Sequence, residues 1–174
     1  MIVRPCPGCG AVFPEVAGPT HGYIESSAAC WNAYGQILAR QYTVPAWMEL
    51  NRLTVDTYAV QHPGQLCRQS TQSVGAHLTA LYAVLELGYS PKAATRLLRR
   101  AVEVIEFSYL PTPKSVGSVT VGDLLPVGTL VEHREQVTAW ATSAWEAWQE
   151  HHAQVRAWVE GLEKVDAVHA SAVR

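Results

Sequence analysis

Hydrophobic residues recur every three or four positions along most of this chain, which is the spacing of one face of an α-helix. The pattern predicts five helices, at about residues 27–44, 50–62, 68–87, 91–107 and 137–162. Pro63-Gly64 and Gly88 follow two of these segments and are typical signals for the end of a helix. We therefore expect an all-α fold, a helical bundle of about five helices.

The last predicted helix has the most regular pattern. From Val137 to Leu162 the apolar positions alternate in steps of four and three, which is typical of a helix packed lengthwise against its neighbours. Four large rings lie on this helix: Trp140, Trp145, Trp148 and Trp158. We interpret them as core residues, because a Trp stripe at core spacing needs no ligand to explain it. His151 shares the apolar seam and should bond to a carbonyl or a carboxylate.

The first 25 residues lack this periodicity and are interrupted by Pro and Gly. We expect residues 1–25 to form an irregular arm that another interaction holds in place, within one helical domain spanning residues 1–174. A second irregular segment, SVGSVTVGDLLPVG, predicts a loop with a short helical turn capped by Asp123. Its Val-rich half is the one place where we expect a strand.

Charge and hydropathy exclude some partners. Lys and Arg total 13 against 15 Asp and Glu, so the formal net charge is -2 and we expect no strongly basic face and no nucleic-acid partner. The N-terminal sequence has no signal-peptide apolar core, and no window reaches transmembrane length. We therefore expect a cytoplasmic protein with no membrane partner. In a reducing cytoplasm, four cysteines are better explained as metal ligands or reactive thiols than as a disulfide framework.

The motif CPGCG, residues 6–10, predicts a metal site. Its Pro-Gly turn lets the thiolates of Cys6 and Cys9 face one centre, as in a zinc knuckle. Cys30 is the expected third ligand, because a helix capped by Ser26 or Ser27 places it in the first turn, where the helix dipole favours a thiolate.

The fourth ligand is less directly indicated. His21 lies inside the loop between Cys9 and Cys30 and is the expected choice. His62, at a helix end before Pro63-Gly64, is the long-range alternative. We thus expect a structural zinc site of three cysteines and one histidine.

Two other interpretations of the cysteines remain open. The CxxC pair could be a redox dithiol, or the thiols could be buried and inert. The strand-then-helix context of a thioredoxin-like motif is absent, which weakens the redox interpretation. We expect Cys67, beside Arg68, to be a half-buried small residue.

A second polar constellation lies in VDTYAVQHPG and QSVGAHL, residues 55–64 and 72–78. On a helix Asp56 shares a face with apolar neighbours, so its carboxylate needs a donor. His77 is the expected donor, because the short loop makes the two helices antiparallel neighbours. Asp56, His77 and His62 are therefore candidate catalytic residues, acting as general base and orienting groups in a pocket for a small-molecule ligand. The alternative is a buried Asp–His pair that only fixes two helices.

The ordered motifs CPGCG, GPTHGYIESSAACW, LTVDTYAVQHPG, SVGAHL and WATSAWEAWQEHH resemble an uncharacterised bacterial family of small single-domain proteins, described as a domain of unknown function. The resemblance covers almost the whole chain and implies no reaction. The positions that match its motifs are Cys6, Cys9, His21, Cys30, Asp56, His62 and His77.

Two functions from different classes are compatible with these residues. The first is a zinc-binding helical-bundle protein whose closed site pins the arm and whose surface meets a partner. The second is a metal-dependent enzyme, hydrolase-like or lyase-like, acting on a small polar substrate. The Trp-rich last helix also offers a surface for a homodimer.

Overall fold

The computed structural model describes residues 2–172, with side chains described as far as Lys164. Within this range it contains seven α-helices, two short 3-10 helices and a two-stranded sheet. The elements are β1 Val3–Pro5, β2 Val12–Pro14, α1 Ala28–Thr43, α2 Pro45–Met48, α3 Asn51–Gln61, α4 Arg68–Leu85, α5 Pro91–Val104, η1 Val121–Leu124, α6 Leu130–Ala147, η2 Gln149–His151 and α7 His152–Ala172. The expected all-α fold is confirmed.

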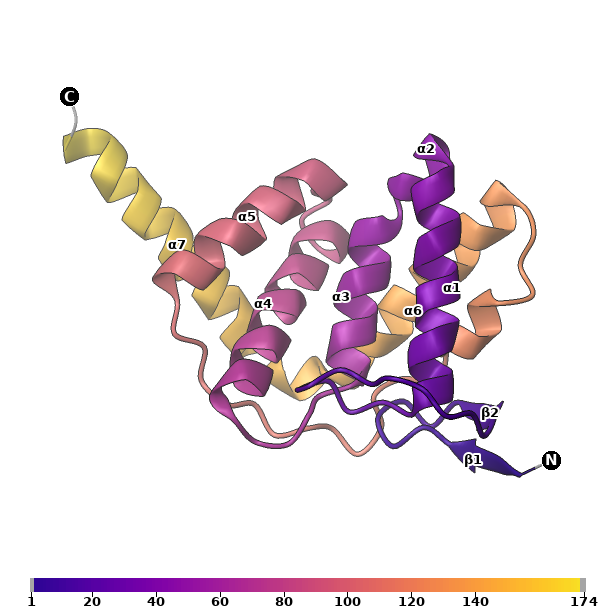
Figure 1. Ribbon diagram of the computed structural model, residues 1–174. Coiled ribbons are helices and arrows are strands. Elements are labelled where there is room, and N and C mark those ends of the chain that lie inside the picture. Colours follow the sequence, from indigo (N-terminus) through magenta and orange to yellow (C-terminus); the bar gives the residue numbers. More distant parts are fainter. Residues whose placement is uncertain (1, 173–174) are drawn as a thin grey trace.

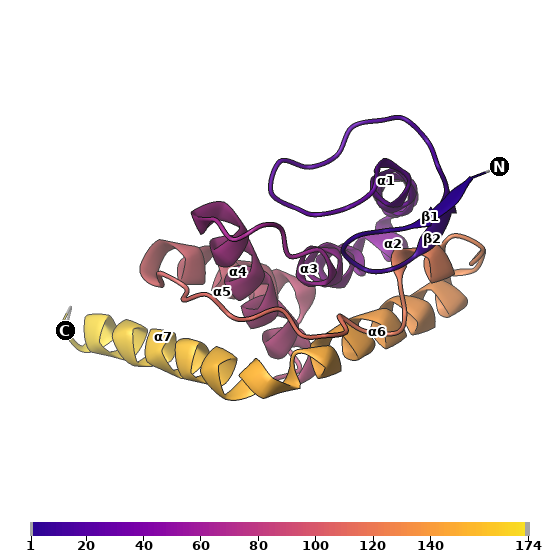
Figure 2. The same cartoon turned by 90° about the horizontal axis from the view of Figure 1, so that it is seen from below.

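The helices form a row that two further helices cross. Helices α1, α3 and α4 stand side by side and are seen nearly end-on in Figure 2, where α6 and α7 run across the row. Helix α5 packs against α4, and the β1–β2 hairpin lies at the end of the row where α1 begins (Figure 1). None of the helices within residues 2–172 combines the length and the apolar composition that crossing a membrane requires.

Helix starts follow the capping signals in the sequence. Ser27 caps α1 and Ser90 caps α5, each accepting a backbone N–H through its hydroxyl oxygen. Asp123 completes a capping box at η1, as expected for the short helical turn. Cys67 differs from expectation: it is exposed, and its sulfur accepts the Ser70 N–H at the start of α4.

Helix α5 ends at Val104, earlier than its hydrophobic pattern predicts. The chain becomes extended there so that Phe107 can enter the core, where it is 2% exposed. A Cβ on Gly75 would lie 2.4 Å from the Phe107 ring, so this close packing requires a glycine in α4. The side-chain amide of Gln72 donates to the Phe107 carbonyl and accepts its N–H, which holds the extended segment against α4.

The prediction of a single long helix from residue 137 to residue 162 is wrong. The chain breaks after α6, because Trp148 leaves helical geometry and buries its ring, donating Nε1–H to the Val60 carbonyl at 3.2 Å. His152 stacks on Trp145 with centroids 3.7 Å apart, and its Nε2 lies 2.9 Å from the Trp145 carbonyl near the end of α6. His151 bonds to the Pro111 carbonyl at 2.8 Å, the kind of partner expected for it.

The strands lie in the arm, not in the Val-rich segment. Strands β1 and β2 pair antiparallel on either side of CPGCG, with Val3 opposite Pro14. The Val-rich segment stays irregular because Gln61 of α3 binds its backbone, donating to the carbonyls of Val116 and Val119. The arm is therefore partly a regular hairpin.

Three of the four Trp residues expected in the core are buried there, whereas Trp158 is only partly buried, with its ring packed edge to face with Phe107 at a centroid distance of 4.9 Å. Trp140 and Trp148 are fully buried and Trp145 is 3% exposed. Each indole N–H has an acceptor: Gln61 Oε1 for Trp140, the Val60 carbonyl for Trp148 and Glu86 Oε1 for Trp145. Buried rings with satisfied N–H groups contribute both apolar area and orientation to the bundle.

A buried polar network joins α1, α3 and α6. The side-chain amide nitrogen of Gln41 donates to Thr54 Oγ1 at 2.7 Å and lies 3.0 Å from His133 Nε2. Because an amide nitrogen only donates, His133 Nε2 accepts and its proton sits on Nδ1, which has no hydrogen-bond partner among the described residues. Burial, and then the charge of Arg40, lower the pKa of His133. His133 is therefore held neutral.

This neutral histidine predicts a specific loss of stability in acid. The pKa of an unfolded histidine is about 6.5, and that of folded His133 is lower, so its contribution is complete above about pH 6.5 and is lost as pH falls through the folded value. In urea denaturation, the free energy of unfolding of the parent should fall more steeply with acidification than that of His133→Gln. Parallel curves for the two proteins would contradict the assignment.

Candidate metal centre

Four metal-ligating side chains converge at the end of the bundle where α1 begins and α3 ends. They are Cys6, Cys9, Cys30 and His62, and their ligand atoms all lie within 4.8 Å of one another. All four residues are buried, with exposed fractions between 0% for Cys30 and 7% for Cys9. Such a group could hold one metal ion.

The distances suit a bound ion better than a disulfide. The Cys9 and Cys30 sulfurs are 3.8 Å apart, far beyond the roughly 2.05 Å of an S–S bond. A tetrahedral ion with metal–sulfur bonds of about 2.3 Å places two sulfurs about 3.8 Å apart. The 3.3 Å between Cys30 Sγ and His62 Nε2 is also close to an edge of such a tetrahedron. The four atoms are therefore arranged around a point that one ion can occupy.

The first two ligands are positioned by the turn between β1 and β2. The Cys6 N–H donates to the Ala11 carbonyl at 2.8 Å, and the Gly10 N–H donates to the Cys6 carbonyl at 2.9 Å. Gly10 has a φ of 76°, a conformation that favours glycine. The backbone N–H of Ser27 donates to Cys6 Sγ at 3.4 Å. One turn of backbone thus aims both thiols at the start of α1.

Cys30 lies where the sequence places it, in the first turn of α1. Its N–H donates to Ser27 Oγ at 3.1 Å, so the helix cap and the ligand are one local structure. The Tyr58 hydroxyl donates to Cys30 Sγ at 3.6 Å. By themselves, the donated hydrogen bond and the positive end of the helix dipole favour a thiolate at this position, but the neighbouring cysteines and burial act against it.

His62 completes the group from the end of α3. Its ring stacks on Tyr58 with centroids 3.9 Å apart, and its Nδ1 lies 2.6 Å from the Tyr58 carbonyl. Because a carbonyl only accepts, Nδ1–H donates to the Tyr58 carbonyl, and Nε2 is the ring nitrogen that faces the three sulfurs. This second bond is the usual way in which proteins orient a metal-binding imidazole.

The thiols and the imidazole perturb one another strongly. Hydrogen bonds from Cys30 and then Cys9 hold the pKa of Cys6 well below its usual range, whereas contact with Cys6, then Cys9, and burial raise the pKa of Cys30. Burial alone would lower the pKa of His62, but the neighbouring Cys6 and Cys9 sulfurs raise it to about 9. Without an ion the centre is thus a cluster of negative sulfur and shared protons, and a cation can replace those protons.

The fourth ligand expected from the sequence has to be corrected from His21 to His62. His21 is not part of the group; its ring contacts Tyr23 and Trp31, with centroids 4.4 and 5.4 Å away. The segment that carries His21 swings out in the wide loop of Figure 2. Pairing of Ile24 with Pro63 and the hydrogen bond from Glu25 N–H to the His62 carbonyl bring the end of α3 to the cysteines.

The sequence alone did not single out the groups that support the ligands. Tyr58 precedes His62 by one helical turn, and that spacing was the available signal. Gly8 is a second such residue, because a Cβ there would lie 2.4 Å from the Glu25 carbonyl oxygen and 2.6 Å from the His62 ring. Only a glycine lets the turn approach His62 this closely.

Gly8→Ala should therefore displace His62 and weaken the whole centre. We expect it to lower the free energy of unfolding by at least about 2 kcal/mol, the scale of backbone strain and overpacking. The matched control is Gly22→Ala in the same arm, where an added Cβ meets nothing within 4 Å. Equal denaturation midpoints for the two variants would show that Gly8 does not support the centre.

The second constellation also forms, on the other side of α3. His77 Nδ1 lies 2.7 Å from Asp56 Oδ1, so the expected contact is confirmed. Arg52, four residues earlier, donates to both Asp56 oxygens, and its Nε lies 2.7 Å from Oδ2. The Asp56 side chain is fully buried, while those of Arg52 and His77 are 17% and 20% exposed. Each carboxylate oxygen is thus engaged; a catalytic role for this pair stays a prediction.

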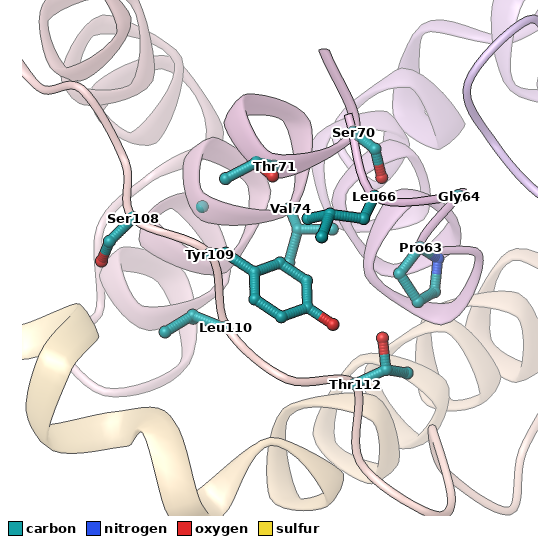
Figure 3. A pocket seen from close by; sticks show the side chains of 11 residues that line it. Pro63, Gly64, Leu66, Ser70, Thr71, Val74, Ser108, Tyr109, Leu110 and Thr112 are labelled. Carbon is teal, nitrogen blue, oxygen red and sulfur yellow. The ribbon is translucent and has the colours of Figure 1, made fainter. Parts of the chain in front are cut away.

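His62 belongs to the metal centre and not to this pair, and the nearby cavities do not include the pair. A cavity of about 10 Å³ lies beside Pro63 and Gly64, with Tyr109 across its middle (Figure 3). It has room for about one water molecule. A wider open cleft of about 550 Å³ is lined by His21 and Cys67 among others. Neither space is lined by Asp56 or His77.

Removal of the buried carboxylate should be costly. Asp56→Ala leaves Arg52 without its partner, so we expect a loss of about 3 kcal/mol in the free energy of unfolding, against about 1 kcal/mol for His77→Gln. Urea denaturation of both variants measures this difference. If both variants are as stable as the parent, the Asp56–His77 pair does not stabilise the packing of α3 on α4. A catalytic role would then be the better explanation for this pair.

Comparison with known proteins identifies the family and leaves its activity open. No significant match was found among curated proteins or among solved structures. A family model described as a family of unknown function, DUF5946, matches residues 4–149, which include all four residues of the metal centre and end before α7. The match covers most of the chain. The chain therefore belongs to this family of unknown function.

Proposed function

We propose that the protein binds one structural zinc ion through Cys6, Cys9, Cys30 and His62. The observation that carries the proposal is the convergence of four buried ligand atoms from three distant segments to within 4.8 Å of one another. Unpaired buried thiols and imidazoles rarely gather in this way without an ion, because each has to be desolvated.

The donor set favours zinc. Three thiolates and one imidazole are soft to borderline ligands, which suit zinc and disfavour magnesium or calcium. The tetrahedral Cys3His set is a common structural zinc site. The Nδ1–H of His62 is already committed to the Tyr58 carbonyl, so only Nε2 is free for the metal.

The role that we propose for zinc is to fasten the arm to α1 and α3. Within residues 2–25 the buried residues are few: Cys6, Cys9 and Ala11. Apolar burial therefore contributes little to holding the arm, and the free energy of metal binding replaces it. A site of this kind requires reduced thiols, and we accordingly place the protein in the cytoplasm.

A metal-dependent enzyme has less support. Catalytic zinc usually keeps one position for water, with three protein ligands, whereas four protein ligands leave no such position. Asp56 and His77 lie outside the ligand group, and both Asp56 oxygens are already bound. Neither the cavity of about 10 Å³ nor the open cleft of about 550 Å³ near the end of α3 is lined by a residue of the ligand group.

The proposal predicts about one zinc per chain in protein purified without chelator, measured by elemental analysis. His62→Ala and Cys9→Ser should each lose most of this metal and melt at a lower temperature, because metal binding is coupled to folding. His21→Ala is the matched control and should retain full zinc.

Two results would refute the proposal. One is parent protein without stoichiometric metal after growth in zinc-supplemented medium. The other is retention of zinc by His62→Ala with its loss from His21→Ala, which would restore the ligand expected from the sequence. A zinc-loaded parent that resists removal of the ion until the chain unfolds would support a closed structural site over an exchangeable one.

A further inference from the structure

The small cavity shown in Figure 3 adjoins the first two turns of α4. The extended segment 108–112 closes it from the other side, and none of the residues that line it is charged. Five of the lining residues carry a hydroxyl group: Ser70, Thr71, Ser108, Tyr109 and Thr112. Within the part of the chain that the structure describes, no hydroxyl of this set has a hydrogen-bond partner. The cavity is therefore surrounded by polar groups that are available to a ligand.

Ser70 distinguishes this cavity from an ordinary surface dent. The residue is only 5% exposed, so its hydroxyl cannot turn away into bulk water. In Figure 3 the hydroxyl points toward Leu66 and Pro63, which line the same cavity. A buried hydroxyl without a partner is unfavourable, and a ligand that accepts its hydrogen bond removes that cost.

The start of α4 adds a positive potential beside this hydroxyl. The first four N–H groups of a helix have no partner inside the helix. In α4 the N–H of Ser70 donates to Cys67 Sγ at 3.4 Å and that of Thr71 to the Cys67 carbonyl at 3.0 Å, while those of Arg68 and Gln69 have no acceptor in the described chain. No acidic residue lies in the first turn. Hydroxyls alone could bind a neutral ligand, but this helix end favours an anion.

Two acidic side chains lie near the start of α4, and neither lines the cavity. Glu106 is paired with Arg68 at 3.6 Å. Glu25 lines the wider cleft of about 550 Å³ from the side of the arm. Gly64 and Leu66 line both spaces, so the cleft adjoins the cavity and can receive the remainder of a larger ligand.

Tyr109 controls the size of the cavity. Its ring lies across the middle of the space, which is about 10 Å³ and too small for an anion larger than water. The neighbouring backbone is fixed, because Gln72 holds Phe107 and His151 holds the Pro111 carbonyl at 2.8 Å. Tyr109 itself is 52% exposed and its hydroxyl has no partner in the described chain. The ring can therefore turn outward by a change of rotamer while the backbone stays in place.

We propose that the cavity at the start of α4 binds an oxyanion, the carboxylate or phosphate group of a small molecule, and that Tyr109 is its lid. Ser70 and Thr71 donate hydrogen bonds to the anion, and the helix dipole stabilises its charge. The site shares no residue with the metal centre, so it goes beyond the zinc proposal and does not depend on it.

The test is an NMR titration of the intact, isotope-labelled protein with sodium acetate, with inorganic phosphate and with acetamide, the uncharged analogue of acetate. Backbone amide signals of residues 64–71 and 108–112 should shift and saturate with at least one of the two anions. The anion that binds more tightly identifies the group. Acetamide should bind at least about tenfold more weakly than acetate if acetate is that anion, because hydrogen bonds to a charged acceptor are the stronger ones.

Three variants test the assigned roles. Ser70→Ala should weaken binding of the better anion about tenfold, because a hydrogen bond to a charged group is lost. Tyr109→Ala should strengthen it at least about threefold, because the ring no longer has to be displaced. The matched control is Ser73→Ala on the same helix, which lines neither space and should bind within about twofold of the parent.

Shifts that do not saturate, or that centre outside these two segments, would show an adventitious ion only and overturn the proposal. Acetamide that binds as tightly as the better anion would overturn the assignment to an anion. Ser70→Ala that binds like Ser73→Ala would overturn it too, and Tyr109→Ala that binds no better than the parent would remove the lid. Circular dichroism and zinc content, measured on the same samples, separate these results from a loss of the fold or of the metal centre.

Discussion

The arm depends on the convergence of Cys6, Cys9, Cys30 and His62, because it contributes few buried residues of its own. Two of its few buried side chains are the ligand cysteines themselves. The hairpin of three residue pairs is too short to be stable alone. The group joins this hairpin to the first turn of α1 and to His62, the residue that follows α3, and it thereby also fixes the distance between those two helices. An ion at this point would stabilise the arm and the ends of α1 and α3 together.

Helix α3 carries the polar contacts that place its neighbours. Its buried polar side chains point in different directions: Thr54 toward α1, Asp56 toward α4, Gln61 toward α6 and the irregular segment after α5, with His62 at its end toward α1 and the arm. Apolar packing is tolerant of small shifts, whereas buried hydrogen bonds have strict geometry. These contacts therefore select one arrangement of helices from the many that the same apolar area could support.

The sequence predicts what is local and misses what depends on chain path. Hydrophobic spacing located the main helices, and capping signals placed Cys30 in the first turn of α1. The choice of His21 over His62 was wrong, because the fourth ligand depends on pairing between Ile24 and Pro63, which only the folded chain brings together. The break after α6 was missed for the same reason: an unbroken helical pattern does not reveal that Trp148 donates to the carbonyl of Val60, 88 residues away.

Where polar groups are already satisfied, little chemistry remains for them to perform. Both oxygens of Asp56 are bound, His62 has a partner on each ring nitrogen, and the thiols beside it lie in a buried group that four ligands close. The polar groups that the sequence marks as candidates for chemistry are therefore engaged in contacts that hold α3, α4 and the arm in place.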